Sequence, residues 1–171
     1  EDWFNVAIVG RVDQVKGHQL AIEATADKRM PANIHLHIVG TGPDEPMLRK
    51  LAETRAVARQ VHFLGFRRDV YNYLAHCQVL LIPSLHEGLP YTLLEGMALG
   101  IPIVASRVGG LAEVLQDSVT ALLVSPGDAQ ALAQAILRLY DDPKLGSQLA
   151  ERAHCLQQAR YSLVSKEYLA C

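Results

Sequence analysis

The sequence predicts a doubly wound α/β fold, a parallel sheet of about six strands with helices on both faces. Short apolar runs rich in β-branched residues alternate along the chain with longer segments of helical periodicity. The apolar runs are almost continuously hydrophobic, which is typical of strands covered on both faces. The chain has 171 residues and is 50% hydrophobic, so it can bury a sizeable core. We therefore expect residues 1–171 to form one domain.

Three strand-and-helix units are predicted in the first half of the chain. Each strand is an apolar run that ends next to a glycine, and a helix follows it. The strands are expected at Phe4–Val9, Ile34–Val39 and Val61–Leu64. The helices are expected at His18–Lys28, Glu45–Ala58 and Asp69–His76. The inward face of the second helix consists of Met47, Leu48, Leu51 and Ala52, which recur with helical spacing.

The second half of the chain is predicted to continue this alternation and to end in helices. Strands are expected at Val79–Ile82, Ile103–Ala105 and Ala121–Val124. Helices are expected at Thr92–Leu99, Leu111–Leu115, Asp128–Tyr140 and Pro143–Gln158. Gly100 ends the first of these helices, Asp128 caps the third and Pro143 begins the fourth, because these residue types favour helix ends. Ser162 is predicted to cap one last helix.

Charge and cysteine content argue against several classes of partner and cofactor. The formal net charge is -2, which leaves no excess of positive charge for a nucleic acid or an anionic membrane. No apolar run reaches the roughly 20 residues of a membrane span. Cys77, Cys155 and Cys171 are odd in number and widely spaced, so neither a disulfide framework nor a zinc site is expected. We expect reduced thiols and a cytoplasmic protein without a signal peptide.

The unusual residues of the sequence gather just after the predicted strands. In doubly wound folds, ligands bind outside the carboxyl ends of the strands. These ends carry Gly10-Arg11, Gly40-Thr41-Gly42, Gly65-Phe66-Arg67-Arg68, the run from Ser84 to Pro90, and the run from Ser106 to Gly110. The sequence therefore predicts one binding site along this edge of the sheet.

Two cations follow the first predicted strand. Arg11 offers a fixed guanidinium and Lys16 a mobile ammonium, so together they can grip a diphosphate from two sides. In a transferase they would stabilise the negative charge that grows on the leaving group. The alternative is that both are solvated cations of a loop.

The loops after the second and third strands offer backbone and aromatic contacts. Gly40 and Gly42 allow a ligand to approach the backbone closely. Glu45 occupies the third glycine position of a dinucleotide fingerprint, which argues against a dehydrogenase. Phe66 and Arg67 can line a pocket for a base, and a plain helix-entry loop is the alternative.

Carboxylates and a double glycine follow the fourth and fifth strands. Glu87 and Glu95 can accept hydrogen bonds from sugar and ribose hydroxyls, or they form a capping or solvated pair. Their spacing does not decide between these alternatives, because Glu45 and Glu53 share it on an ordinary helix. The double glycine Gly109-Gly110 exposes backbone N–H groups that favour an anion, or it forms a flexible turn.

Taken together, these residues resemble the C-terminal domain of the GT-B glycosyltransferase family that includes sucrose-phosphate synthases and bacterial mannosyl- and glucosyltransferases. The resemblance covers Val6 to about Pro143 and is most specific from Leu81 to Gly110. The residues that match there are Pro83-Ser84, Glu87-Gly88, Leu93-Leu94-Glu95, Met97-Ala98, Gly100, Pro102, Val104-Ala105-Ser106 and Gly109-Gly110. Further matches are Gly10-Arg11, Lys16-Gly17, Gly40-Thr41-Gly42-Pro43 and Phe63-Leu64-Gly65. The resemblance implies a Rossmann-like half of a GT-B fold.

The resemblance also implies roles for individual residues. Arg11 and Lys16 would bind the diphosphate of a nucleotide-diphosphate sugar during catalysis, and Glu87 would contact the hydroxyls of the donor sugar. The donor-binding residues would further include Gly10, Gly40, Gly42, Phe66, Arg67, Gly88, Leu89, Glu95, Gly109 and Gly110. Among these, the backbone around Phe66 would hold the base and Glu95 the ribose. Members of the family usually transfer with retention and without a metal ion or other cofactor, and the leaving diphosphate helps to deprotonate the acceptor.

A second domain is implied as well. GT-B enzymes react in a cleft between two domains, and the N-terminal one, which binds the acceptor, is expected to be absent from this chain. We therefore expect little transfer by the chain alone. The acceptor would be a glycan or a lipid-linked molecule, met in the cytoplasm or at the cytoplasmic face of a membrane through that domain. Two alternatives stay open: a regulatory nucleotide-sugar module, and another GT-B enzyme such as an epimerase. The sequence shows no context for a lysine-bound cofactor that would support a phosphorylase.

Three positions depart from the pattern of the family. Pro90 stands where many relatives carry glycine, and it has no N–H for a hydrogen bond to the donor sugar. Gly96 replaces a common alanine, which predicts a mild loss of helix stability. Asp117-Ser118 stands where Asp-Gly is common.

Overall fold

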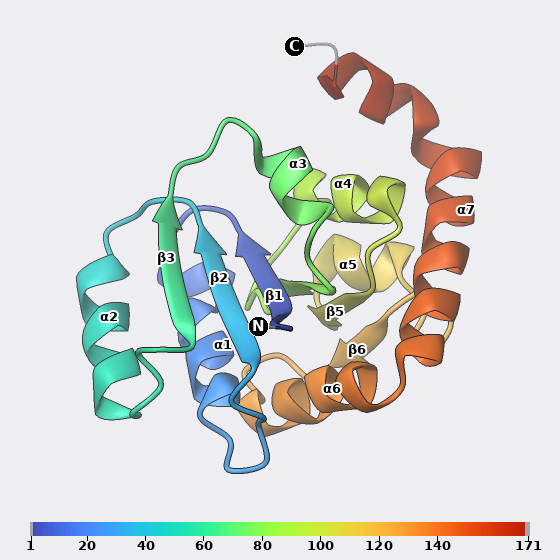
Figure 1. Ribbon diagram of the computed structural model, residues 1–171. Helices are drawn as coiled ribbons and strands as arrows, with labels where there is room; N and C mark the ends of the chain where they lie inside the picture. The colour runs from blue at the N-terminus through green and yellow to red at the C-terminus, as the bar shows by residue number, and fades with distance from the viewer. Residues whose placement is uncertain (1, 170–171) are drawn as a thin grey trace.

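The computed structural model describes the backbone of residues 2–169 and the side chains of residues 2–161 (Figure 1). Its strands form one six-stranded parallel sheet in the order β3-β2-β1-β4-β5-β6. The predicted fold class is therefore confirmed. Cys77 and Cys155 are free thiols, and Cys171 lies outside the described residues.

The strands lie where their apolar runs predict them, to within one residue at each end. Their bounds are β1 Phe4–Val9, β2 Ile34–Val39, β3 Val61–Gly65, β4 Val79–Ile82, β5 Ile103–Ser106 and β6 Leu122–Val124. Every residue of β2, β4, β5 and β6 is buried, as expected for strands that helices cover on both faces.

The strand order reverses between β1 and β4. From β1 the chain adds β2 and β3 on one side, and it then crosses over to place β4 on the other side of β1. The loops that follow β1 and β4 therefore leave the sheet next to each other, although about seventy residues separate them in sequence. Doubly wound folds bind their ligands at such a switch point.

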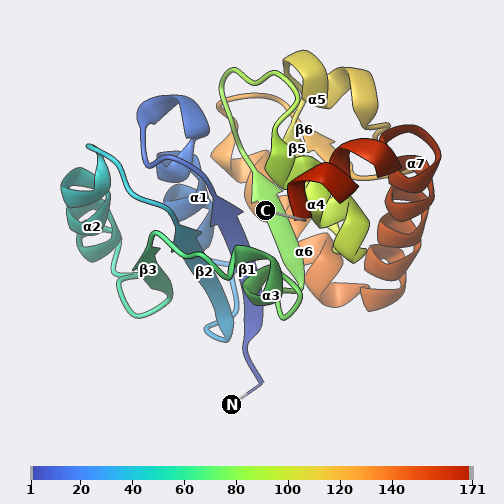
Figure 2. The same cartoon turned by 90° about the horizontal axis from the view of Figure 1, so that it is seen from above.

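Helices cover both faces of the sheet (Figures 1 and 2). Their bounds are α1 His18–Thr25, α2 Glu45–Thr54, α3 Val70–Leu74, α4 Tyr91–Leu99, α5 Gly109–Val114, α6 Ala129–Asp141 and α7 Pro143–Leu169, with a short 3-10 turn η1 at Gln14–Lys16. Helices α1, α2 and α6 pack on one face, and α3, α4 and α5 pack on the other. A separate hydrophobic core lies on each face, the first under α1, α2 and α6 and the second under α3, α4 and α5. Helix α7 contributes to both cores, with Leu149 in the first and Ala153 in the second. Alternate residues of β1 point to different faces, so Val6 and Ile8 belong to the first core and Ala7 belongs to the second.

Helices α1 and α2 end three and four residues earlier than predicted. After α2, Ala56 adopts the left-handed conformation with φ 59°. The N–H of Val57 then donates to the carbonyl of Ala52 (2.9 Å), which closes the helix end. Alanine disfavours this conformation, so the sequence carries no signal for the early end.

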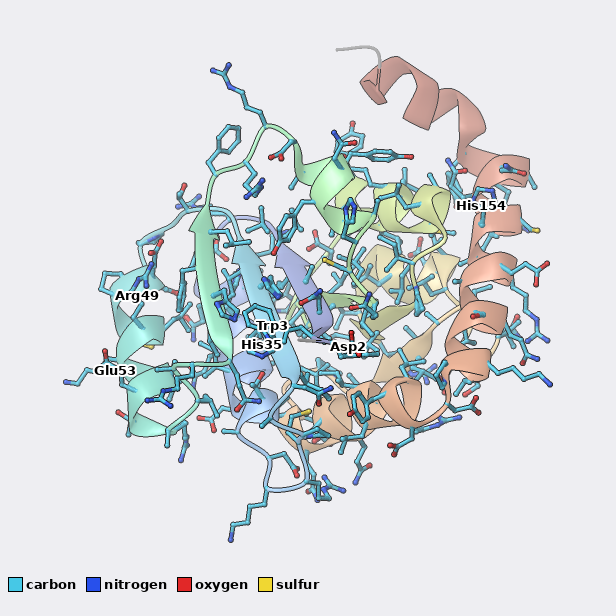
Figure 3. The ribbon with its side chains drawn as sticks, viewed as in Figure 1. Asp2, Trp3, His35, Arg49, Glu53 and His154 are labelled. Carbon is cyan, nitrogen blue, oxygen red and sulfur yellow. The ribbon has the colours of Figure 1, made fainter. Side chains whose placement is uncertain are left out.

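The last predicted helix does begin at Pro143, but the predictions that it ends near Gln158 and that Ser162 caps a further helix were wrong. A single helix, α7, continues through Gln158 and Ser162 to Leu169, so Ser162 caps no separate helix. Serine costs little inside a helix, and neither glycine nor proline interrupts residues 147–169. The first part of α7 packs along α4, where Nδ1 of His154 lies 3.1 Å from the carbonyl oxygen of Met97 (Figure 3).

Candidate functional site

The loops after β1 and β4 meet at an ion pair. Nζ of Lys16, at the end of η1, lies 2.6 Å from Oε2 of Glu87. The hydroxyl of Ser84, the second residue after β4, donates to the same carboxylate oxygen at 3.1 Å. The Glu87 side chain is only 12% exposed, so it is held by a cation and a hydroxyl in a partly buried place.

A glycine makes this meeting of loops possible. Gly17 adopts φ +73°, and a Cβ atom at this position would collide with the backbone carbonyl of Pro83. Beside it, the N–H of Leu85 donates to the carbonyl of Val15 at 2.8 Å. The Lys16-Gly17 pair therefore places the ammonium and lets the β1 loop lie against the β4 loop.

Arg11 lies at the open side of the same site. Its side chain is 71% exposed, and Nε lies 3.5 Å from Oδ2 of Asp13. Asp13 also caps η1, because its carboxylate accepts a hydrogen bond from the N–H of Lys16 at 3.2 Å. One acidic residue thus contacts both ends of the loop that carries the two cations.

The two cations and Glu87 line one pocket, which we call the central pocket. Its volume is about 280 Å³. It is lined by Ile8, Val9, Gly10, Arg11, Lys16, Leu81, Ile82, Pro83, Ser84, Glu87, Pro90, Tyr91 and Thr92. Tyr91 and Thr92 were not predicted as site residues from the sequence, although their place at the start of α4 was a signal for them. Ser84 was predicted only as part of the run from Ser84 to Pro90, without a role of its own.

Two further pockets flank the central pocket and share lining residues with it. The β2–β3 pocket, of about 360 Å³, is lined by Val9, Gly10, Arg11, Val39, Gly40, Thr41, Phe66, Arg67 and Val70. The β4–β5 pocket, of about 710 Å³, is lined by Val15, Lys16, Leu85, His86, Glu87, Gly88, Val108, Gly109 and Pro126. Arg11 lines both the β2–β3 pocket and the central pocket, and Lys16 lines both the central pocket and the β4–β5 pocket. The three pockets therefore form a continuous row with the two cations near its middle.

Two predicted glycines serve loop packing instead of lining a pocket. A Cβ at Gly42 would collide with the backbone of Val12, and one at Gly110 would collide with the carbonyl of Gly88. The N–H of Gly110 donates to the carbonyl of Glu87 at 3.2 Å. This N–H is therefore already used, contrary to the expectation that the double glycine exposes it to an anion.

Leu89 and Glu95 also lie outside the residues that line the three pockets. Leu89 is 44% exposed in the loop before α4. Glu95 is half-buried one turn after Tyr91, and burial raises the pKa of its carboxyl. Among residues 2–161 it has no hydrogen-bond or ion-pair partner, so its oxygens are available to a ligand that reaches it.

The second pair of glutamates with the same spacing lies on the outside of the molecule. Glu45 is held by Arg49 in an exposed ion pair of 2.7 Å along α2. Glu53 is exposed one turn further on, and Figure 3 shows it at the outer side of α2. The fold therefore separates two pairs that spacing alone does not distinguish.

At the far end of the β2–β3 pocket, Arg67 is fixed by two neighbours. Its Nε and Nη2 atoms donate to the two carboxylate oxygens of Asp69 at 2.9 and 2.7 Å. Its guanidinium carbon lies 4.8 Å from the ring centroid of Tyr73. Phe66 remains 75% exposed and is free to lie against a planar ligand.

No group of three potential metal ligands occurs within the part of the chain that the structure describes. Within the same residues, no helix combines the length and the apolar character that a membrane crossing requires.

The family model of the glycosyl transferases group 1 matches residues 4–142, well over half of the chain. The chain belongs to the glycosyl transferases group 1 family. Among curated relatives, it is 36% identical over 149 residues to the lipopolysaccharide core biosynthesis glycosyltransferase LpsE of Rhizobium meliloti, covering 87% of this chain and 43% of LpsE. It is 34% identical over 161 residues to the alpha-D-kanosaminyltransferase of Streptomyces kanamyceticus, covering 92% and 42%.

Solved glycosyltransferases share the fold. The crystal structure of Anabaena HepE in complex with UDP superposes with a TM-score of 0.91 at 26% identity, over 99% of this chain and 48% of HepE. The complex of HepE with UDP-glucose gives a TM-score of 0.90. The chain therefore spans less than half the length of these relatives.

Proposed function

We propose that this chain is the donor-binding domain of a retaining, metal-independent glycosyltransferase that uses a nucleoside diphosphate sugar. The observation that carries the proposal is the row of three pockets with Arg11 and Lys16 near its middle. An elongated ligand with two negative charges between two uncharged ends matches this order of shapes and charges. The complexes of the related HepE with UDP and UDP-glucose favour a uridine nucleotide.

Each part of the donor has a place along the row. The base would lie in the β2–β3 pocket against Phe66 and the diphosphate between Arg11 and Lys16. The sugar would extend toward the β4–β5 pocket, where Glu87 and backbone groups of Gly88 meet its hydroxyls. Glu95, half-buried and unpaired among residues 2–161, would accept hydrogen bonds from the ribose.

The chemistry that we propose breaks the bond between C1 of the sugar and the β-phosphate oxygen. The acceptor oxygen attacks C1 on the face that the phosphate leaves, and the acceptor proton passes to the departing phosphate oxygen. Arg11 and Lys16 stabilise the charge that develops there, in the role that a metal ion has in other transferases. Glu87 keeps the Lys16 ammonium in position through the 2.6 Å contact.

The other wall of the reaction cleft would come from a second domain that binds a glycan or lipid-linked acceptor. We therefore propose that the 171-residue chain binds the donor but transfers little sugar on its own. Retention is tested with a parent protein that contains both domains. The anomeric configuration of its transfer product is determined by NMR and compared with that of the donor sugar.

Donor binding is tested by calorimetric titration of the chain with UDP, UDP-glucose, GDP and ADP, with and without EDTA. We expect UDP to bind equally well in EDTA. Arg11→Ala should weaken UDP binding by about 1.5–3 kcal/mol, on the order of 10- to 150-fold. Arg59→Ala is the matched control, because this exposed arginine precedes β3 at the opposite edge of the sheet. Equal UDP affinity in both variants would remove the role proposed for Arg11.

A further inference from the structure

We propose that Tyr73 is a positioning residue of the donor site: anchored by His37, it holds the Arg67 guanidinium at the wall of the β2–β3 pocket and so strengthens binding of the base. The inference rests on the proposed donor-binding function. It concerns α3, which the sequence motifs of the site do not include. Three contacts connect the pocket to the centre of the sheet.

The first contact orients Arg67. Its guanidinium carbon lies 4.8 Å from the centroid of the Tyr73 ring, while its Nε and Nη2 atoms donate to the two oxygens of Asp69. The carboxylate fixes the plane of the guanidinium, and the ring supports the plane from one side. Arg67 lines the β2–β3 pocket, so the position of its side chain shapes the place of the base.

The second contact holds the ring of Tyr73. Its hydroxyl oxygen lies 2.6 Å from Nδ1 of His37, and Nε2 of His37 lies 2.9 Å from Oδ1 of Asn5. Oδ1 of Asn5 only accepts hydrogen bonds, so Nε2 of His37 carries the proton and donates it. Nδ1 is then an acceptor, and the tyrosine hydroxyl donates to it. The three groups satisfy one another in a single tautomer.

The third contact, between His37 and Asn5, connects these hydrogen bonds to the sheet. Asn5 belongs to β1 and His37 to β2, so both are held by the hydrogen bonds between these central strands. On the same face, Trp3 stacks on His35 with ring centroids 3.8 Å apart (Figure 3), and His62 lies 4.9 Å from the His37 ring. Burial and the neighbouring histidines lower the pKa of His37 to about 4, so at neutral pH it remains an acceptor for Tyr73.

A purely structural role for Tyr73 would attach α3 to the sheet without affecting Arg67. The positioning role and the purely structural role predict different changes in affinity for ligands with and without a base. A positioning role through Arg67 affects a ligand that contains a base, whereas general loosening of the loops also affects the diphosphate site at Lys16. Inorganic pyrophosphate, which has no base, therefore separates the two.

The experiment measures dissociation constants for UDP and for inorganic pyrophosphate, together with the melting temperature, in the full chain. Tyr73→Leu removes the ring, and Tyr73→Phe removes only the hydroxyl that donates to His37. Tyr140→Phe is the matched control. Tyr140 lies on α6, away from the pockets, and the substitution removes a tyrosine hydroxyl that donates to Asn33 at 3.1 Å. Arg67→Ala and the double variant with Tyr73→Leu complete a double-mutant cycle.

We expect Tyr73→Leu to weaken UDP binding by about three- to tenfold and Tyr73→Phe by about two- to threefold. Pyrophosphate binding should stay unchanged in both, and Tyr140→Phe should alter neither ligand. In the Arg67→Ala background, Tyr73→Leu should have no further effect on UDP, because its partner is gone.

Three results would overturn the inference: unchanged UDP affinity in Tyr73→Leu, an equal loss for UDP and pyrophosphate, or additive losses in the double variant. Should Tyr73→Leu fail to fold, unchanged UDP affinity in Tyr73→Phe has the same meaning. Failure of the unsubstituted chain to bind UDP would instead reject the proposed function, and the role of Tyr73 with it. The two failures are therefore distinguishable before any variant is made.

Discussion

Replacement of Lys16 by alanine should weaken both the fold and the donor site, for separate reasons. The Lys16 and Glu87 side chains are 30% and 12% exposed, and their charged atoms lie 2.6 Å apart. Without the ammonium, the Glu87 carboxylate retains one partner among the described residues, the hydroxyl of Ser84. A mostly buried carboxylate that loses its counter-ion is costly, whereas an uncharged amide at the same position is not.

The expected magnitudes follow from the burial of the pair. An unpaired buried group costs about 1–3 kcal/mol, and the partial exposure of Lys16 places the loss in unfolding free energy near 1–2 kcal/mol. Adding Glu87→Gln to Lys16→Ala removes the unpaired charge, so the double variant should recover most of this loss. The affinity for UDP should fall on the order of 10- to 150-fold in both variants, because neither has the cation.

Urea denaturation followed by circular dichroism measures the stability, and calorimetric titration with UDP measures the affinity. The single variants Lys16→Ala and Glu87→Gln complete a thermodynamic cycle. The reasoning is refuted if the stability losses of the two single variants simply add in the double variant. It is equally refuted if Lys16→Ala binds UDP as tightly as the unsubstituted chain.

Four further predictions concern positions outside the cation pair. Gly96→Ala should destabilise the protein by about 1 kcal/mol, because the new Cβ would collide with the buried Leu80 side chain and this outweighs the better helix propensity of alanine. In thermal melts, adding Leu80→Val to Gly96→Ala should relieve the loss. Ser118→Gly should stabilise by up to about 1 kcal/mol in urea denaturation, because Ser118 adopts φ 58°, and a lower midpoint would contradict this. His18→Leu should stabilise by about 1–3 kcal/mol, because neither buried ring nitrogen of His18 has a hydrogen-bond partner within the described part of the chain; lower stability of the variant would disprove it. Between about pH 6.5 and pH 8 the unfolding free energy should be constant, and it should fall from pH 6.5 toward pH 4. The pKa values of His18 and His37 are lowered, that of His37 to about 4, so the unfolded state binds more protons than the folded state in the acidic range. An equal unfolding free energy at about pH 4.5 and pH 7 would contradict this.

The sequence by itself determined the order of the strands and helices and the edge of the sheet that carries the site. Local patterns suffice for this, because the period of apolar residues reports which segments become strands or helices and glycines mark the strand ends. In a doubly wound fold, residues just after the strands gather at one edge whatever the detail of the loops. Arg11, Lys16 and Glu87 were therefore predictable as neighbours.

Only the tertiary structure decided which groups touch one another. The Lys16–Glu87 ion pair depends on the reversal that places β1 beside β4, and the contact of Tyr73 with His37 depends on the packing of α3 over β2. Gly110 illustrates the same limit, because whether its N–H is free depends on a loop that folds against it from more than twenty residues away. Such contacts join segments that are distant in sequence, so their geometry follows from packing and cannot be derived from the local pattern of residues.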